Sequence, residues 1–189
     1  VLAGTTVKRA SLHNADEIAR KDIRPGDTVV IERGGEVIPK VVEVILTERP
    51  FDARPFEMPA QCPVCGAHVA AVEGEVDVRC PNASCPAQIE ERIKHYARRQ
   101  AMDIEGLGDK LVAALVQKGA LRDIADLYSL GADFLASLDR MGDKSAANLV
   151  ASISRSREAG LERLLFGLGI RFVGERAAAD PRLAAIEAG

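Results

Sequence analysis

Apolar residues in the first quarter of the chain occur in short runs rather than in long stripes. Two of these runs, Thr28–Ile31 and Val41–Ile45, consist largely of β-branched residues, which favour strands. Between them Gly34-Gly35 is typical of a hairpin turn, and Pro39 indicates that the second strand lies at an edge or a bulge. A short helical turn is expected near residues 16–21. Several short strands joined by tight turns predict a small β-barrel over residues 1–48.

The pattern changes twice further along the chain. Residues 49–60 contain three prolines and no apolar period, which predicts a linker. Residues 61–87 form a module too short to fold on apolar burial alone. From residue 88 to residue 189 the apolar positions follow the helical period. Three stripes show this period: Ile89, Ile93, Tyr96 and Ala97; Leu111, Ala114 and Leu115, ending at Gly119; and Ala146, Leu149, Val150 and Ile153, ending near Gly160.

The cysteines of the chain stand in two close pairs, Cys62 with Cys65 and Cys80 with Cys85. Proline, glycine and asparagine flank both pairs, so each pair can lie on a turn that presents two thiolates to one ion. The spacing predicts a structural zinc site with four cysteine ligands and no position open to water. Metal binding would then supply the stability that the short module lacks.

Two alternatives to this zinc site stay open at this point. The cysteines could form two disulfides, although nothing at the start of the chain has the pattern of a secretory leader. His68 lies between the two pairs and could replace one thiolate. A catalytic metal is not indicated, because four cysteines close the coordination shell and the other histidines, His13 and His95, are far apart in sequence. His95 is expected at the surface or at a hinge.

Three loops of the helical part share one pattern: apolar, two variable residues, apolar, glycine, acid, base. They span residues 104–110, 138–144 and 170–176, and their glycines are 34 and then 32 residues apart. This period predicts repeated helix–loop–helix units in which a helix begins directly after the glycine. The unpaired amides and the positive dipole end at such a helix start suit an anion, and phosphate is the obvious one.

A base follows the acid in each loop, at Lys110, Lys144 and Arg176. A cation in the first turn opposes the helix dipole, so its threefold occurrence indicates that these side chains face something negative. The alternative is a set of plain turns between helices with solvated charges. If the phosphate interpretation holds, binding follows the nucleic-acid backbone, is independent of base sequence and is sensitive to salt.

Composition limits these interpretations only in part. The chain has 189 residues, 47% hydrophobic and 4% aromatic, so a single aromatic-packed core is not expected. Its net charge of −3 and pI near 5.7 do not indicate a nucleic-acid binder, although backbone amides can bind phosphate without formal charge. No apolar run is long enough to cross a membrane. The chain begins with Val1 rather than Met, which indicates a piece of a longer protein.

The order of barrel, four-cysteine module and helical repeats resembles the central and C-terminal part of bacterial NAD-dependent DNA ligase. Specific segments are similar to that family over residues 1 to about 178. They are residues 4–14 (GTTVKRASLHN), Gly26-Asp27-Thr28-Val29 with residues 35–39 (GEVIP), the cysteine spacing, and residues 103–108 (DIEGLG), 138–142 (LDRMG) and 169–175 (GIRFVGE).

The resemblance implies a multidomain α+β protein. Its parts would be an OB-type β-barrel at residues 1–48, a linker at 49–60, a four-cysteine zinc finger at 61–87 and an all-α helix-hairpin-helix domain at 88–189. The family seals nicks in duplex DNA through an AMP intermediate, and its nucleophilic lysine lies in a K-x-D-G motif. That motif does not occur in this sequence. The chain alone is therefore expected to be inactive, with NAD and Mg²⁺ bound mainly outside it.

The resemblance also implies partners and site residues. The partners would be nicked duplex DNA and a nucleotidyltransferase domain of the same protein, in a monomer located in the bacterial cytoplasm and associated with the nucleoid. Gly34 replaces the family's usual alanine, and the fourth hairpin of the family is not seen before Gly189. The implied DNA contacts are Arg9, His13 and Arg33 in the barrel, and Gly106, Gly108, Lys110, Gly142, Lys144, Gly174 and Arg176 in the hairpins.

A second hypothesis accommodates the acidic pI. In it the chain is a zinc-stabilised protein-interaction module whose helical part docks a protein partner and has no role with nucleic acid. Replacement of the three loop glycines by bulkier residues separates the two hypotheses, because it weakens duplex binding only in the first.

Overall fold

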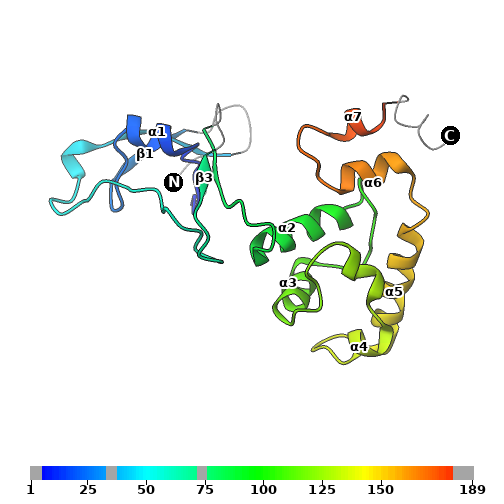
Figure 1. Ribbon diagram of the computed structural model, residues 1–189. Coiled ribbons are helices and arrows are strands. Elements are labelled where there is room, and N and C mark those ends of the chain that lie inside the picture. Colours follow the sequence, from blue (N-terminus) through cyan, green and yellow to red (C-terminus); the bar gives the residue numbers. More distant parts are fainter. Residues whose placement is uncertain (1–5, 33–37, 72–75, 181–189) are drawn as a thin grey trace. The chain divides into compact units, whose positions relative to one another are not determined.

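The computed structural model describes residues 6–32, 38–71 and 76–180 of the chain. The chain divides into two compact units, Val1–Pro81 and Asn82–Gly189, which Figure 1 colours from blue to green and from green to red. The first unit contains α1 (Ala15–Arg20), β1 (Val29–Glu32), β2 (Lys40–Val44), the 3₁₀ helix η1 (Leu46–Glu48), β3 (Ala70–Ala71) and β4 (Val78–Arg79). The second contains α2 (Pro86–Ala97), α3 (Asp109–Gln117), η2 (Ala125–Ser129), α4 (Ala132–Ala136), α5 (Asp143–Ser156), α6 (Leu161–Gly167) and α7 (Glu175–Ala178).

The two strands predicted near the start of the chain are present. β1 and β2 pair antiparallel, with a shift in register between Val30 and Ile31. Ser11 adds a parallel bridge at Lys40, so β2 is bonded on both sides. Within the described residues, these contacts form a two-stranded sheet extended by one bridge and do not close a barrel. The predicted turn at Gly34-Gly35 lies outside them.

Polar contacts hold the first unit together at the end of its sheet. The Arg49 guanidinium donates to the Asp27 carboxylate (Nε–Oδ1, 2.8 Å) and to Asp22 (Nη1–Oδ2, 2.6 Å). Asp27 also accepts the backbone N–H of Arg24, and its side chain is 1% exposed. This network joins residues more than 20 positions apart. The network lies in a unit with little apolar burial. Among the residues described before Pro81, only three apolar residues are buried: Val41, Val44 and Cys62.

The second unit is built on a continuous apolar core. Helix α2 contacts α3 and α6, α4 and η2 contact α5, and α6 lies beside α7 (Figure 1). The predicted stripe of α2 is fully confirmed, because Ile89, Ile93, Tyr96 and Ala97 are all buried. Leu115 and Leu149 of the other two stripes are no more than 1% exposed. The core is aliphatic apart from Tyr96, as the low aromatic content predicts.

His95 differs from its expected place at the surface or a hinge. Its ring is half-buried against Phe166 of α6, with 4.9 Å between the ring centroids, and its Nε2 lies 2.9 Å from the Phe166 carbonyl oxygen. The adjacent Tyr96 faces the core, so α2 packs with more of its circumference than one stripe. The sequence did not predict this contact, because the sequence pattern is the same for a histidine on an exposed helix surface and for one between two helices.

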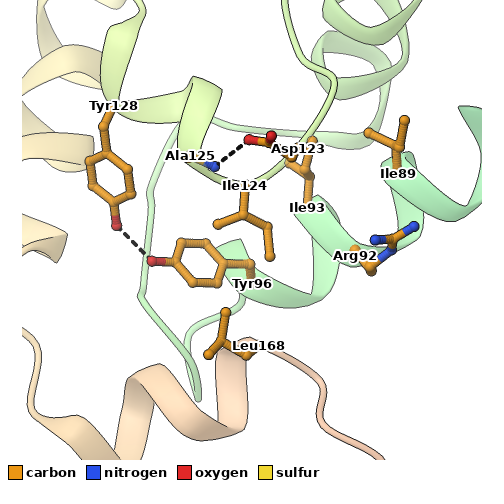
Figure 2. Close-up of a pocket in the computed structure, with 9 residues that line it drawn as sticks. All are labelled: Ile89, Arg92, Ile93, Tyr96, Asp123, Ile124, Ala125, Tyr128 and Leu168. Carbon is orange, nitrogen blue, oxygen red and sulfur yellow. Dashed lines mark hydrogen bonds between the residues drawn. The ribbon is translucent and has the colours of Figure 1, made fainter. Parts of the chain in front are cut away.

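A mainly apolar pocket of about 400 Å³ lies between α2, η2 and Leu168, and the Tyr96 and Tyr128 hydroxyls meet beside it at 2.8 Å (Figure 2). Burial raises the pKa of Tyr96, so its hydroxyl is neutral in the physiological range.

Among the described residues, no helix has the length and apolar character that a membrane crossing requires.

Candidate metal centre and nucleic-acid interface

The first cysteine pair lies on a tight turn. The N–H of Gly66 donates to the Cys62 carbonyl (2.9 Å), and the N–H of Cys62 donates to the Ala67 carbonyl (2.8 Å). Gly66 has φ +71°, a conformation that glycine adopts without steric cost. The bridge between Gln61 and His68 closes the turn. Cys62 and Cys65 therefore come from one rigid loop.

The second pair follows a short hairpin. β3 and β4 pair antiparallel and return the chain to Cys80, which directly follows β4. The Asn82 side chain accepts the N–H of Ser84 (2.9 Å), and the Asn82 carbonyl accepts the N–H of Cys85 (3.0 Å). Cys85 is the N-cap residue of α2, and its backbone N–H and the helix that follows fix its place beside the first pair.

The four sulfur atoms lie within 4.8 Å of one another. The Cys65 and Cys80 Sγ atoms are 3.5 Å apart, well beyond the length of about 2.05 Å of a disulfide bond. Thiolates about 2.3 Å from a tetrahedral zinc ion are separated by about 3.8 Å, so the donor set fits that metal. His68 is exposed and does not belong to the cluster. Cys62 and Cys85 are buried, as a structural site requires.

Each of the three repeated loops ends where a helix begins. Gly108, Gly142 and Gly174 are the N-cap residues of α3, α5 and α7, and all three have extended backbone without a side-chain cap. Their carbonyls accept the first helical N–H donors at 2.9–3.0 Å. The prediction that a helix begins directly after each glycine is confirmed. The third helix has only four residues, so a helix dipole can contribute at α3 and α5 alone.

The loops share a second backbone feature that the sequence did not disclose. Two residues before each N-cap glycine, Gly106, Arg140 and Phe172 have φ of +87°, +64° and +65°. All three loops therefore turn through one left-handed residue at the same place. The one sequence signal for this turn was Gly106, because glycine adopts a left-handed conformation freely. Arg140 and Phe172 occupy the same position of the repeat but gave no such signal.

The helix starts are open to a ligand. A Cβ atom placed on Gly108, Gly142 or Gly174 would meet no atom within 4 Å. The three glycines are exposed, and so are the acid and base that follow each of them. The space beside the glycines that precede α3 and α5 is thus not filled by neighbouring side chains.

The cations beside these glycines contrast with others in the second unit. Lys110 and Lys144 make no hydrogen bond or ion pair with any residue that the structure describes. Lys94, by comparison, lies 2.9 Å from Glu91, and that carboxylate raises the pKa of Lys94. The overall negative charge comes from residues 1–81, since residues 82–189 carry equal numbers of basic and acidic residues. The loop cations are therefore available to an external anion.

The first loop is fixed to α5 by a contact that sequence reasoning missed. The N–H of Glu105 donates to the hydroxyl of Ser152 (2.8 Å), which is 2% exposed. A polar hollow of about 440 Å³ lies beside this contact. It is lined by Glu105, Gly106, Ser145, Asn148, Leu149, Ala151 and Arg155.

Two of the predicted contacts in the first unit are exposed, and one of them lines a second polar hollow. Arg9 and His13 are exposed, and His13 has φ +63° next to Asn14, the N-cap of α1. His13 lines a hollow of about 480 Å³ together with Asn14, Glu17, Arg20, Lys21, Lys40 and Val42. The structure thus places lysines near His13 that the sequence analysis did not select. Arg33 lies outside the described residues.

Family comparison assigns two parts of the chain. Residues 1–53 match the NAD-dependent DNA ligase OB-fold domain, and residues 61–87 match the NAD-dependent DNA ligase C4 zinc finger domain. These are an OB-fold and a zinc module of one enzyme class. The chain carries the OB-fold and C4 zinc finger domains of NAD-dependent DNA ligase, which confirms the resemblance and favours zinc over disulfides.

Curated relatives cover almost the whole chain. Proteins named DNA ligase from Halalkalibacterium halodurans and Myxococcus xanthus are 55% and 54% identical over 177 residues, 94% of this chain. A DNA ligase from Methylococcus capsulatus is 57% identical over 175 residues, 92% of this chain. The matched segment is 26% of each relative, so the chain spans about a quarter of their length.

Proposed function

We propose that this chain is the DNA-binding part of an NAD-dependent DNA ligase, which joins nicks in duplex DNA by phosphodiester formation through an AMP intermediate. The chain would hold nicked duplex by its sugar-phosphate backbone, without sequence specificity. The single observation that supports this most is the set of three like loops, each of which starts a helix at an exposed glycine facing open space. Backbone amides at such positions bind phosphate without reading bases.

The proposal assigns the helical part to a helix-hairpin-helix domain. The repeated pattern, the shared left-handed residue and the common N-cap geometry support this assignment. Proposed contacts are Gly106, Gly108, Lys110, Gly142, Lys144, Gly174 and Arg176, with Arg9, His13 and Arg33 in the OB-fold part. The boundaries at residues 48, 60 and 87 belong to the same proposal.

The chemistry of joining would lie elsewhere in the parent enzyme. The K-x-D-G motif does not occur in this sequence, so we assign the adenylated lysine, NAD and Mg²⁺ to a nucleotidyltransferase domain of the same protein. That domain and nicked DNA would be the partners of this chain in a monomeric enzyme of the bacterial cytoplasm, at the nucleoid. Incubation of the chain with NAD and Mg²⁺ should yield no covalent AMP adduct by mass spectrometry. Detection of such an adduct would refute this part.

Salt dependence tests the binding mode. We expect fluorescence anisotropy with a labelled nicked duplex to give a dissociation constant that rises steeply with salt, because counterions are released from neutralised phosphates. Lys110→Ala should weaken binding and reduce the slope of log Kd against log salt by about one. The matched control is Lys118→Ala, at the opposite end of α3, which should leave both quantities unchanged. Affinity that is indifferent to salt would exclude backbone binding.

Substitution at the helix starts tests the amide site separately from charge. Gly142→Ser places a good N-cap residue where φ is −88° and no atom is near, so the fold should be retained or slightly stabilised. The same hydroxymethyl group would occupy the space in which a phosphate must approach the amides. We expect weaker duplex binding with an unchanged or higher melting temperature. Unchanged binding in both Gly108→Ser and Gly142→Ser would instead favour a protein-interaction module.

A further inference from the structure

The left-handed position of the three loops holds three chemically different residues. It is glycine at 106, arginine at 140 and phenylalanine at 172. A glycine there costs little, whereas a bulky side chain at positive φ is a genuine outlier because its Cβ approaches the backbone. The third loop retains phenylalanine at a position where the first loop shows that glycine suffices. Local backbone stability therefore does not explain Phe172.

Packing does not explain Phe172 either. Its side chain is 87% exposed, on the loop between α6 and α7. Exposure of an aromatic ring to water is a second cost, in addition to that of the backbone. Sterically costly residues persist when surrounding structure or function requires them.

A cation accompanies the ring. The Arg171 guanidinium carbon lies 4.8 Å from the centroid of the Phe172 ring, which is a cation–π contact. This contact occupies one face of the ring and leaves the other face open. Two residues further on, Gly174 is the N-cap of α7 and faces open space. The third loop thus presents a positive charge, one free aromatic face and an accessible backbone within four consecutive residues.

We propose that Phe172 is an aromatic nucleic-acid contact that packs its free face against a nucleotide, while Arg171 lies toward the adjacent phosphates. This inference rests on the proposed DNA-binding function and adds a residue to it. With one face covered by Arg171, the ring contacts a single deoxyribose or base and does not insert between two bases. In the third loop, apolar contact then contributes binding free energy that the dipole of a four-residue helix does not supply.

The test compares three variants on the same labelled duplexes. Phe172→Ala should weaken binding roughly tenfold, as is common for loss of an aromatic stacking partner, without a change in the salt slope. Phe172→Gly should weaken binding similarly and raise the melting temperature, because glycine relieves the left-handed conformation. Phe51→Ala is the control, since Phe51 is at least as exposed (104%) and should leave affinity unchanged.

The choice of duplex distinguishes a sugar contact from a base contact. If the ring packs on deoxyribose, the loss caused by Phe172→Ala is the same for continuous duplex, for nicked duplex and for nicked duplex with abasic sites beside the nick. If it packs on a base exposed at the nick, the loss is confined to the nicked duplex with its bases intact. Either result supports the contact.

Two results would overturn the role of Phe172. One is wild-type affinity of Phe172→Ala on all three duplexes while Lys110→Ala still weakens binding, which leaves the proposed function intact. The other is a melting temperature of Phe172→Ala well below that of Phe51→Ala, which indicates that the ring packs on the protein. Failure of the unsubstituted chain to bind any duplex would instead refute the proposed function itself.

Discussion

The two units of this chain reach stability by different means. The described part of residues 1–81 has three buried apolar side chains, short strands and an arginine–aspartate network. Residues 82–180 contain a continuous aliphatic core to which α2, α3 and α5 all contribute. A small β-rich unit can thus rely on polar and metal contacts where a helical unit of similar length relies on apolar packing.

The largest expected effect is loss of metal from the cysteine cluster. A module of this size depends on its ion for roughly 10–16 kcal/mol of folding free energy. Cys65→Ser or prolonged chelation should therefore abolish order around residues 61–81. The core of α3 and α5 should keep its protection from amide exchange. Zinc content by a chromogenic chelator, together with hydrogen exchange, measures both, and simultaneous loss of protection in the two regions would contradict the comparison.

The next effect in size is a cavity in the helical core. Leu115 is 0% exposed in α3, so Leu115→Ala should cost about 2–5 kcal/mol in the free energy of unfolding of residues 82–189. Zinc content should stay at that of the unsubstituted chain, because Leu115→Ala removes no thiolate and only Cys85, the N-cap of α2, belongs to this unit. Leu46→Ala is a suitable control, since Leu46 is 66% exposed. Denaturant unfolding followed by circular dichroism gives the comparison.

Acid should weaken the first unit before the second. Hydrogen bonds from Arg24 and Arg49 lower the pKa of Asp22 from 3.8 to about 2, and Arg49 lowers the pKa of Asp27. Because these pKa values are depressed in the folded state, their contribution is fully present above pH 4 and is lost as pH falls toward 2. Asp27→Asn should lower the melting temperature at pH 7 and flatten this acid dependence. An acid profile identical to that of the unsubstituted chain would argue against the network.

The smallest expected effect concerns the hydroxyls beside the apolar pocket. Tyr128 Oη lies 2.8 Å from Tyr96 Oη and 3.1 Å from Ser156 Oγ. Tyr128→Phe removes both hydrogen bonds and leaves Tyr96 with an unpaired hydroxyl, at a cost of about 1–3 kcal/mol. The double variant Tyr96→Phe/Tyr128→Phe should recover part of that loss, because no hydroxyl is then left unpaired. Thermal unfolding of the two variants checks this order.

Sequence predicted the elements whose signal is local. The apolar stripe predicted helix α2, and the cysteine spacing predicted the metal cluster. The repeat predicted that helices begin directly after Gly108 and Gly142. Contacts between distant residues gave no such signal. Arg49 with Asp27 and Ser152 with Glu105 are pairs of ordinary surface residue types, and only the folded chain brings them together. The left-handed backbone at Arg140 and Phe172 was missed because neither residue type favours it.

The common geometry of the three loops has a practical outcome for engineering. Because residues 104–110, 138–144 and 170–176 follow one turn-and-cap path, they should be exchangeable as cassettes. Replacement of residues 104–110 by the sequence of residues 138–144 would put an arginine at position 106, without redesign of the flanking helices. Exchange of one heptapeptide at a time could in this way raise or lower the affinity of the loops for their ligand.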